Sequence, residues 1–324
     1  MNGLKRNKNV KVIKYPLSDL DFSLKKFKSL IEESDYIYIP PFRHSDVKGI
    51  RKLANKPIIF DPLISKYLTR TIDYGKWWTA PEKYLRDWVA FKNSDIILMD
   101  TQEDKNFIIK KYNLSKENIL VVPIGVDTSI FKPELSVPNK RFTIGFHGGF
   151  IPLQGIDKIV EAALILKNED VIFDIVGSGP LYKKIKKLSD RLNPGNIKFR
   201  GWVDYDKISP IINQFDLCLG IFGDSIKTDM VVPNKVYEYA AIKKCIITKD
   251  TPAIKEIFID NSDIKMTTAH PEKIAEAIIE LKSDFHKREK ISENAYKLIT
   301  GSYDEKGIAK ILVEKLKSWR LTVI

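Results

Sequence analysis

The chain has 324 residues, of which 44% are hydrophobic, 30% charged and 10% aromatic, and this composition excludes disordered, collagen-like and disulfide-stabilised miniproteins. At roughly 100 to 200 residues per domain, the length predicts two domains. The 54 basic and 42 acidic residues give a net charge of +12, which favours an anionic partner such as nucleic acid, an acidic membrane surface or a phosphorylated small molecule.

Cysteine usage and hydropathy predict a cytoplasmic protein. The two cysteines, Cys218 and Cys245, lie in apolar runs and lack the spacing of a disulfide framework or a zinc site. The basic N-terminus has no apolar segment of signal-peptide length, and no run approaches the ~20 apolar residues of a membrane span. Any membrane association is therefore expected to be peripheral, at the inner face.

Short β-branched runs alternate with amphipathic helical stretches, which predicts parallel sheets covered by helices. The expected strands of the first half are residues 10–13, 36–39, 57–60, 96–99 and 119–122, with helices at 24–33 and 103–112. Those of the second half are residues 142–146, 172–176, 197–199, 217–221 and 245–248. Residues 132–140 lack apolar periodicity and predict an interdomain linker, whereas 304–319 predict a long final helix.

Two glycine-rich turns join strands to helices in the second half. The first, HGGFIPLQG, contains Gly148, Gly149 and Gly155, and the second, VGSGP, contains Gly177 and Gly179. Glycine lets backbone N–H groups approach a phosphate, and a helix N-terminus adds partial positive charge. Neither turn has the spacing of a Walker loop or a full dinucleotide motif. Taken singly, each is better explained as a plain tight turn.

A third group lies in the segment PNKVYEYAA. Asn234, Lys235 and Glu238 project to one side of the first turns of a predicted helix. A carboxylate there can accept hydrogen bonds from a ribose diol, and a lysine near a helix start strengthens an anion site. The alternative is a solvated Lys/Glu pair on an exposed helix. The apolar residues that follow favour a buried helix.

From residue 93 to 258 the chain resembles the retaining, nucleotide-sugar-dependent glycosyltransferases of family 4, which have the GT-B fold. The segments that carry this resemblance occur in the expected order and include FHGGFIPLQGIDKIVEAA, DIVGSGP and PNKVYEYAAIKKCIITKDTPAIKEIF. The resemblance implies two α/β, Rossmann-like domains facing each other across a cleft. Residues 1–134, with a C-terminal helix at about 303–324 crossing back, would bind the acceptor. Residues 135–302 would bind the nucleotide-sugar donor.

Carried over position by position, the resemblance implies a donor site in the second domain. Its expected members are Gly148 and the loop up to Gly155, with Gly149 and Gln154, at the diphosphate, the backbone around Trp202 and Val203 at the base, and Glu238 at the ribose hydroxyls. Asn234 and Lys235, placed beside Glu238 by the helix spacing, are further donor-binding candidates. The family has an arginine where Gly149 stands, a lysine where Gln154 stands and a glutamate where Met230 stands.

Replacements for these missing charges must come from elsewhere in the chain. Lys235 is the favoured cation, with His147 and Lys227 as further candidates, and Asp224 or Asp229 could supply the missing carboxylate. The alternatives are a buried histidine at His147 and, for Lys227, a polar loop, which is the better explanation.

The first domain offers fewer signals for the acceptor. Asp61 directly follows a predicted strand and could orient an acceptor hydroxyl or act as a base, or else cap the next helix. His44, also after a strand, is expected to point to the cleft. Trp77 and Trp78, next to Lys76, could stack on sugars or rest on a membrane interface, although core packing of one tryptophan is the simpler expectation.

We therefore expect a glycosyltransferase that moves a sugar from a nucleotide-diphosphate-sugar to a hydroxyl of a glycan or lipid-linked glycan, with retention. Asp61, Lys235 and Glu238 are the expected catalytic residues. No metal-carboxylate motif occurs, so no metal and no cofactor are expected. The alternative is an inactive nucleotide-sugar-binding or scaffold protein. A nucleic-acid binder is disfavoured because the lysines are scattered over every helix.

Overall fold

A computed structural model describes residues 2–15, 23–135 and 139–323. The chain divides into two compact units: unit 1 comprises Met1–Pro123 and Ile308–Ile324, and unit 2 comprises Ile124–Gly307. Within the described residues, no helix has both the length and the apolar character needed to cross a membrane.

Unit 1 is built on a four-stranded parallel sheet. Its strands β1 (Ile37–Ile39), β2 (Ile58–Phe60), β3 (Ile96–Met99) and β4 (Ile119–Val121) pair in sequence order. The helices are α1 (Asn2–Arg6), α2 (Leu24–Glu32), α3 (His44–Leu53), α4 (Ala80–Lys92), α5 (Gln102–Tyr112) and, shared with unit 2 at its first residues, α13 (Glu305–Val323). Shorter elements are a π-helix η1 (Leu68–Asp73) and the 3-10 turns η2 (Trp77–Thr79) and η3 (Lys116–Asn118).

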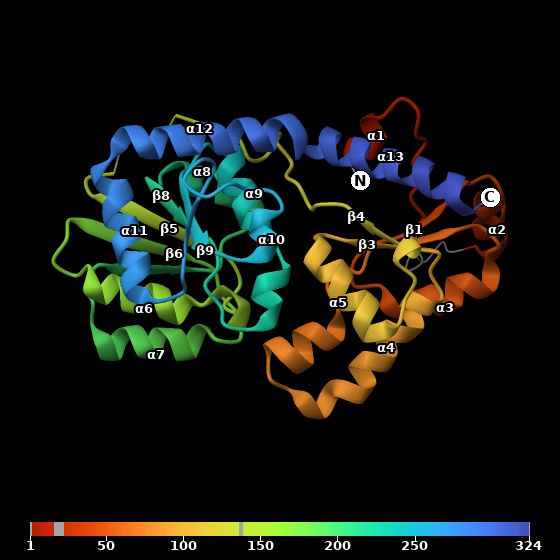
Figure 1. Cartoon of the computed structure of the whole chain (residues 1–324), viewed down its shortest axis with the longest axis horizontal. Helices are drawn as coiled ribbons and strands as arrows, with labels where there is room; N and C mark the ends of the chain where they lie inside the picture. Colours follow the sequence, from red (N-terminus) through yellow and green to blue (C-terminus); the bar gives the residue numbers. More distant parts are fainter. Residues whose placement is uncertain (1, 16–22, 136–138, 324) are drawn as a thin grey trace. The chain divides into compact units, whose positions relative to one another are not determined.

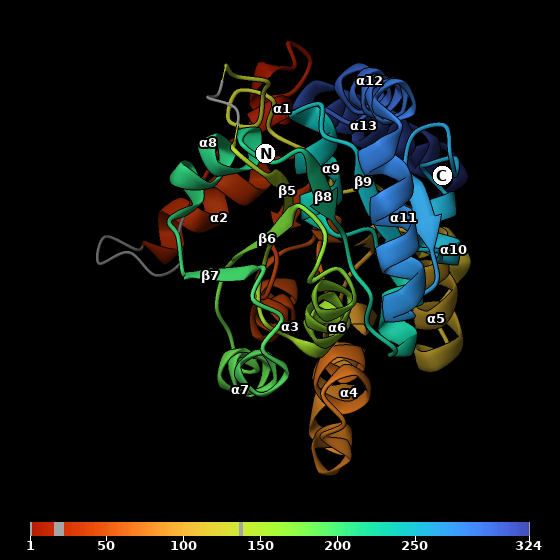
Figure 2. The ribbon, with the colours of Figure 1, turned by 90° about the vertical axis from the view of Figure 1, so that its left-hand side faces the viewer.

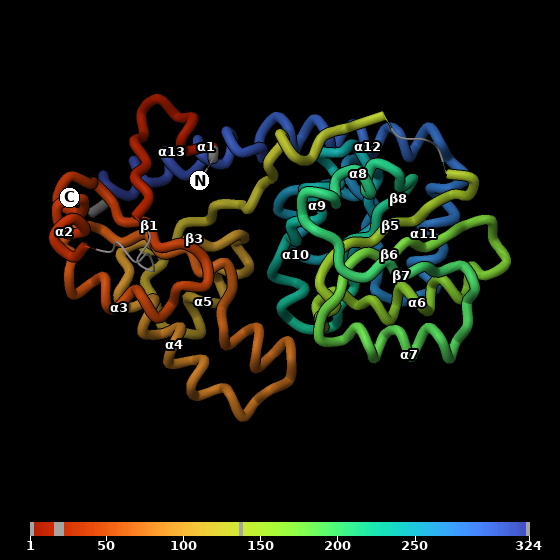
Figure 3. Tube along the Cα trace, turned by 180° about the vertical axis from the view of Figure 1, so that it is seen from behind, coloured from red at the N-terminus to blue at the C-terminus, as the bar shows by residue number. Residues whose placement is uncertain are grey.

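Helices cover both faces of this sheet, as the apolar strands require. Helices α2, α3, α4 and α5 bury their apolar residues on one face, where Phe60 and Phe91 pack together. Helix α13 covers the other face through Leu312 and Trp319, and Leu4 of α1 packs there too. Figures 1 and 3 show these two layers from opposite sides. The predicted final helix is thus confirmed.

Unit 2 is built on a six-stranded parallel sheet in the order β10-β9-β8-β5-β6-β7. The strands are β5 (Phe142–His147), β6 (Val171–Val176), β7 (Ile197–Gly201), β8 (Leu217–Leu219), β9 (Ile246–Lys249) and β10 (Lys265–Thr267). The helices are α6 (Ile156–Ile165), α7 (Tyr182–Leu192), α8 (Ile208–Asn213), α9 (Asn234–Ala241), α10 (Pro252–Lys255), α11 (Pro271–Ser283) and α12 (Phe285–Ser302), with 3-10 turns η4 (Pro152–Gln154), η5 (Tyr205–Lys207) and η6 (Ile226–Met230).

Two apolar cores sandwich this second sheet. One contains residues of α6, α7 and α11, and the other contains residues of α8, α9, α10 and α12. Figure 2 looks at unit 2 and shows α8, α9 and α12 on one side of the strands and α6 and α7 on the other. A doubly covered parallel sheet of this kind places its loops, and any ligand site, at the strand ends.

Most of the expected strands are confirmed within two residues, but the strand at 10–13 is wrong. The Val10 N–H bonds to the Asn7 carbonyl in a turn, and Ile13 is 40% exposed. Residues 10–13 therefore belong to an irregular segment and form no strand. Strand β10 was not predicted, since its three residues KMT at the edge of the sheet carry little apolar alternation.

The linker expected at 132–140 is wrong for its first residues. Phe131 is fully buried in a core of unit 2. The side chain of Asn213 bonds to both Lys132 O and the Glu134 N–H. These contacts attach the segment to unit 2, so the division falls at Pro123/Ile124 instead of 134/135, and at Gly307/Ile308 instead of 302/303. Residues 136–138 lie outside the described part of the chain.

Candidate functional site

The order in which the chain adds strands to the unit 2 sheet changes direction at β5, the first strand of the unit. Strands β6 and β7 lie on one side of β5, and β8, β9 and β10 lie on the other. The carboxyl ends of β5 and β8 therefore form a topological switch point, where open α/β sheets bind ligands. The loop after β5 and the loop after β8 are tied together there, because the Phe222 N–H donates to Gln154 O at 3.1 Å and the Gly223 N–H to Leu153 O at 3.1 Å.

The glycine loop after β5 leaves room for a cation at its back and for a ligand at its front. A Cβ at Gly148 would lie 2.9 Å from Lys235 Nζ, so a larger residue would collide with the ammonium. A Cβ at Gly149 would meet nothing closer than 3.9 Å, and Gly149 is exposed. The Gly148 and Phe150 N–H groups bond to Val176 O and Ser178 O. These bonds hold the loop in a rigid shape.

The second predicted glycine turn supports the first. A Cβ at Gly177 would lie 2.0 Å from Gly148 O, so the absence of a side chain lets the two turns touch. The Leu181 N–H also donates to Phe150 O at 2.9 Å. The structure thus gives the Gly177 turn a packing role against the loop that carries Gly148.

Lys235 supplies a buried amine to this site. It extends from the first turn of α9, and its Nζ donates to Gln154 Oε1 and lies 3.4 Å from the centroid of the Phe146 ring. Burial lowers the pKa of Lys235 well below its ordinary value, and the nearby Glu238 partly opposes this shift. Its amine thus lies at residue 154, the position where the resemblance implies a lysine.

Glu238 and His147 form a buried pair beside this lysine. His147 Nε2 lies 2.9 Å from Glu238 Oε2, and the Tyr205 hydroxyl donates to Glu238 Oε1 at 3.3 Å. The backbone N–H of His147 donates to the Tyr239 hydroxyl at 2.9 Å, and the rings of the two residues meet edge to face. Burial lowers the pKa of His147, with Glu238 opposing the shift. Burial, then Glu238, raises the pKa of Tyr205.

The structure therefore brings together Gly148, Gly149, Gln154, Gly155, His147, Lys235 and Glu238, which come from the β5 loop and from α9. Phe146, Tyr205 and Tyr239 belong to the same cluster and were not predicted. Two of them had signals in the sequence: Tyr239 directly follows Glu238, and Tyr205 lies in the segment WVDY with Trp202. The Phe146 ring under the lysine had no signal beyond a strand position.

Other predicted residues lie around this cluster. Trp202 is highly exposed after β7, Asn234 is exposed at the start of α9, and Val203 packs partly against the α9 core. Lys227 is buried in η6, so the polar-loop interpretation of Lys227 is wrong. Asp224 pairs with Lys158 at 2.7 Å, and Asp229 pairs with Lys249 at 3.0 Å. Each of these two carboxylates is thus neutralised by its own lysine.

In unit 1, polar residues also gather at the carboxyl ends of the strands. Asp61, directly after β2, accepts a hydrogen bond of 2.6 Å from the Tyr38 hydroxyl and one of 3.1 Å from the Leu63 N–H. Burial raises the pKa of Asp61. Burial, and then Asp104 and Asp61, raise the pKa of Asp100, which follows β3. Asp61 does not cap a helix, because β2 is followed by an irregular turn.

His44 is a core residue, and its expected position at a ligand cleft is wrong. It is buried at the start of α3, with its ring 4.9 Å from that of Phe60, and its Nε2 lies 3.4 Å from Asp87 Oδ1. Burial, then Lys66, lowers the pKa of His44 to about 4. The helix α3 turns this side chain inward, where it fills space between aromatic residues.

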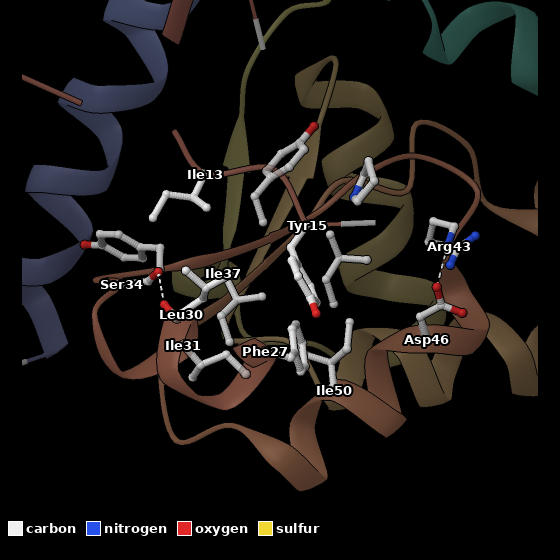
Figure 4. A pocket seen from close by; sticks show the side chains of 14 residues that line it. Ile13, Tyr15, Phe27, Leu30, Ile31, Ser34, Ile37, Arg43, Asp46 and Ile50 are labelled. Atoms are coloured by element: carbon white, nitrogen blue, oxygen red, sulfur yellow. Dashed lines mark hydrogen bonds and ion pairs between the residues drawn. The ribbon is translucent and has the colours of Figure 1, made fainter. Parts of the chain in front are cut away.

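Unit 1 also contains a pocket of about 340 Å³ along β1. Figure 4 shows Phe27, Ile37 and Ile50 lining it, with the Arg43–Asp46 ion pair at one side. Because this arginine is already neutralised by an aspartate, the pocket offers no free positive charge to a diphosphate. Among the described residues, no group of three or more His, Cys, Asp or Glu side chains is arranged to hold a metal ion.

Comparison with solved structures identifies the fold. HepE of Anabaena, crystallised with UDP, superposes with a TM-score of 0.71 over 91% of this chain and 82% of HepE, at 17% identity. Sucrose-phosphate synthase of Thermosynechococcus elongatus gives a TM-score of 0.76 over 92% of this chain and 77% of that protein, at 13% identity. The two units with parallel sheets therefore have the GT-B fold of glycosyltransferases.

Residues 127–298, more than half of the chain, match the family of glycosyl transferases group 1, and the chain belongs to this family. An uncharacterised glycosyltransferase of Methanocaldococcus jannaschii is 26% identical over 60% of this chain and 54% of its own length. The putative colanic acid biosynthesis glycosyl transferase WcaI of Escherichia coli is 26% identical over 46% of this chain and 39% of its own length. The chain thus spans about half the length of the first of these relatives and less than half of the second.

Proposed function

We propose that this protein transfers a sugar from a nucleotide-diphosphate-sugar to a hydroxyl group of an acceptor. The observation that carries this proposal is the buried Lys235 ammonium at the back of the glycine loop, beside Glu238, at the switch point of the unit 2 sheet. Family membership supports it, as do the structures of HepE with UDP and with UDP-glucose.

The donor would lie along the carboxyl ends of β5, β8 and β7. We infer that its diphosphate lies at Gly148 and Gly149, where Lys235 neutralises charge and the first turns of α6 and α9, which have no side-chain cap, add N–H donors. An anion there would also favour the charged form of Lys235, whose pKa burial lowers. The carboxylate of Glu238 would accept bonds from the ribose hydroxyls, replacing the long bond from Tyr205. Trp202 and Val203 would contact the base.

We infer transfer with retention and without a metal ion. The bond between the sugar C1 and the diphosphate oxygen breaks, the acceptor oxygen bonds to C1 on the same face, and the acceptor proton passes to the departing diphosphate oxygen. Lys235 and the helix N-termini would stabilise the charge that develops on the leaving group. Turnover is expected to persist in EDTA, and abolition by EDTA with rescue by a divalent ion would contradict this part of the proposal.

The acceptor would be a glycan or lipid-linked glycan bound by unit 1. Asp61 is the candidate to orient its hydroxyl, because it lies at the carboxyl end of the parallel sheet, and Tyr38 already positions its Oδ2. The positive net charge further suggests work at a membrane surface that carries such an acceptor.

The decisive experiment screens UDP-, GDP-, ADP- and CMP-sugars by thermal shift and then assays transfer with the donor that binds. A bound donor raises the apparent stability by RT ln(1 + [L]/Kd), so one nucleotide should raise Tm more than the others. Glu238→Ala should remove most of this rise. A wild type that responds to none of these nucleotides would contradict the proposed donor site.

An inactive nucleotide-sugar-binding protein is the second candidate. Gly149, Gln154 and Met230 favour it, since the resemblance places charged residues at all three positions. Measuring donor hydrolysis separates the two functions: an enzyme turns over the donor slowly in the wild type and less in Glu238→Ala, whereas a binding protein shows a donor-induced rise in Tm without turnover in either form.

A further inference from the structure

An exposed apolar surface of unit 1 lies on the segment that connects β2 to β3. Its members are Trp77 and Trp78 of η2 and Leu85 and Trp88 of α4, which are 74%, 64%, 56% and 38% exposed, and we name them the tryptophan surface. The expectation that one of the paired tryptophans packs in the core is therefore wrong. Their rings meet edge to face with centroids 6.2 Å apart, so they stand together outside the core.

Helix α4 is apolar on two sides. It buries Ala90 and Phe91 in the core of unit 1, yet Leu85 and Trp88 face outward. Trp78, Leu85 and Trp88 follow at steps of seven and three residues, which places them along one stripe of the helix and the turn before it. Because a solvated helix normally has a polar outer face, this stripe marks a surface that meets an apolar partner.

Basic residues outnumber acidic ones in the segment that carries the tryptophan surface. Residues 66–92 contain the basic residues Lys66, Arg70, Lys76, Lys83, Arg86 and Lys92 and the acidic residues Asp73, Glu82 and Asp87. Asp73 and Asp87 are buried, and Glu82 is paired with Lys83 and Arg86 at 2.8 Å each. Arg70, Lys76 and Arg86 are all exposed. The apolar residues of this surface therefore have exposed cations near them in the chain: Arg70 and Lys76 precede Trp77, and Arg86 follows Leu85. We call these three cations its margin.

The position of this segment in the fold exposes it further. The chain leaves β2, runs out from the sheet through η1 and η2, and turns back into α4, so that this part forms an outer corner of unit 1 (Figure 1). Lys66 contributes to the crowding of cations there: burial, and next the neighbouring Arg86, lower the pKa of Lys66. An anionic partner would relieve this repulsion.

We propose that the tryptophan surface docks unit 1 on an anionic lipid bilayer. Trp77 and Trp78 enter the interface between headgroups and acyl chains, a region that indole rings favour because they are apolar with one polar N–H. Arg70, Lys76 and Arg86 contact lipid phosphates, and their aliphatic stems lie along the apolar boundary.

Two other partners fit the observations less well. A neutral glycan can stack on tryptophan faces but has no need of the cationic margin. A second copy of the chain, paired through the same surface, would bring Arg70, Lys76 and Arg86 against their own equivalents. A bilayer containing acidic lipids satisfies both the apolar centre and the positive margin.

The test is co-sedimentation of the full chain with phosphatidylcholine vesicles that contain or lack phosphatidylglycerol, at low and high salt. We expect binding to the acidic vesicles that weakens with salt. Trp77→Ala with Trp78→Ala should reduce the partition coefficient about tenfold or more, since two large apolar side chains are removed. Arg70→Glu with Lys76→Glu should reduce it by at least a similar factor, because each cation near an acidic surface contributes about fivefold.

Matched controls come from unit 2. Phe285→Ala removes an aromatic residue that is 56% exposed, and Lys183→Glu with Lys184→Glu reverses two exposed charges, and neither should alter vesicle binding by more than about twofold. A second measurement needs no variant: acyl chains brominated near the headgroup should quench the tryptophan fluorescence of the wild type. Absence of vesicle binding, absence of quenching, or equal binding by the tryptophan variant would overturn the proposal.

The two alternative partners give their own contradictory results. A tryptophan variant that loses affinity for a soluble glycan while retaining vesicle binding would assign the surface to the acceptor sugar. A wild-type dimer that the variant converts to a monomer would assign it to a second copy.

This inference deepens the proposed function only in its lipid-linked acceptor, and vesicle binding is measured without donor or acceptor. The tryptophan variant should keep the donor-induced rise in Tm. A protein that binds donor but not vesicles would therefore refute the membrane inference alone, and one that binds vesicles but no donor would refute only the proposed transfer.

Discussion

Each unit contains a buried histidine next to a buried carboxylate, yet the two pairs have different surroundings. In unit 1, His44 faces Asp87 at 3.4 Å between aromatic rings, and Asp87 accepts bonds from Ser65, Tyr112 and two backbone N–H groups. In unit 2, His147 faces Glu238 at 2.9 Å at the end of β5.

The difference lies in what else each pair touches. The unit 1 carboxylate uses its oxygens to hold α5 and the residues just before η1 in place, so that pair is part of the packing of the core. The unit 2 pair adjoins a cation, Lys235, and a glycine loop with an open front at Gly149. A histidine and a carboxylate are thus a better candidate for a ligand site when an open glycine loop accompanies them.

The largest effect is expected at Lys235, because its buried amine contacts the glycine loop where the charge of the leaving group would develop. Lys235→Met should lower kcat/KM for the donor by about 10³-fold, the usual loss when a group that stabilises leaving-group charge is removed. Lys244→Met is the matched control: Lys244 is also partly buried and donates to Asn213 O at 2.7 Å, but it lies outside the site. Equal activity losses in both variants would show that Lys235 is merely structural.

The close approach of Gly148 to this lysine gives the next prediction. Gly148→Ala places a methyl group 2.9 Å from Lys235 Nζ and should reduce kcat/KM about 100-fold by displacing the cation. Both Gly148 and Gly195 have a positive φ, of 150° and 76°, but a Cβ at Gly195 would meet nothing within 4 Å. Gly195→Ala should therefore cost some stability and leave turnover unchanged. Full activity in Gly148→Ala would mean that the ammonium does not need its present position.

A variant of Asp61 tests whether unit 1 has a ligand site separate from the His44–Asp87 pair. Asp61→Asn should lower transfer to the acceptor by about 10- to 100-fold, while donor binding by thermal shift remains as in the wild type. Asp46→Asn, which removes a carboxylate paired with Arg43 in the same unit, is the control. A loss of donor binding in Asp61→Asn, or unchanged transfer, would refute the role assigned to Asp61.

The smallest effect on activity, and the clearest on stability, is expected at His44. Its folded-state pKa is lowered to about 4, so the unfolded chain binds the additional proton as the pH falls below about 6.5. The stability contributed by neutral His44 is thus complete above pH ~6.5 and is lost between ~6.5 and ~4, amounting to about 3 kcal/mol. His44→Gln should flatten this part of the curve without changing turnover.

Denaturant unfolding at several pH values measures this slope. Burial raises the pKa of Asp87, so this carboxyl lowers the stability of the folded protein as the pH rises above the ordinary pKa range of an aspartate, opposite to the effect of His44. Lys66 and Arg86 also face His44. The difference between wild type and variant isolates His44, since these neighbours and His147 are present in both. A parallel pair of curves would contradict the core assignment.

Much of the fold could be predicted because the strands are short apolar runs flanked by glycine, proline or charge. Ile96–Met99, for example, was predicted at both ends. The irregular segment at 10–13 and the edge strand β10 could not be predicted, because for such short stretches only a pairing partner decides whether a strand forms. The exposure of Trp77 and Trp78 could not be predicted either, because apolar composition alone does not distinguish a core residue from a surface residue.

The sequence alone determined that the chain contains two α/β units and predicted the glycine loop and the α9 segment as parts of a candidate site, because turns and periodicity are local properties. Only the tertiary structure decided which lysine lies against the glycine loop. Lys235 and Gln154 are 81 residues apart in the chain and meet because β5 and β8 pair side by side. It likewise decided that His147 borders the site and His44 the core, since both follow from which neighbours pack around a side chain.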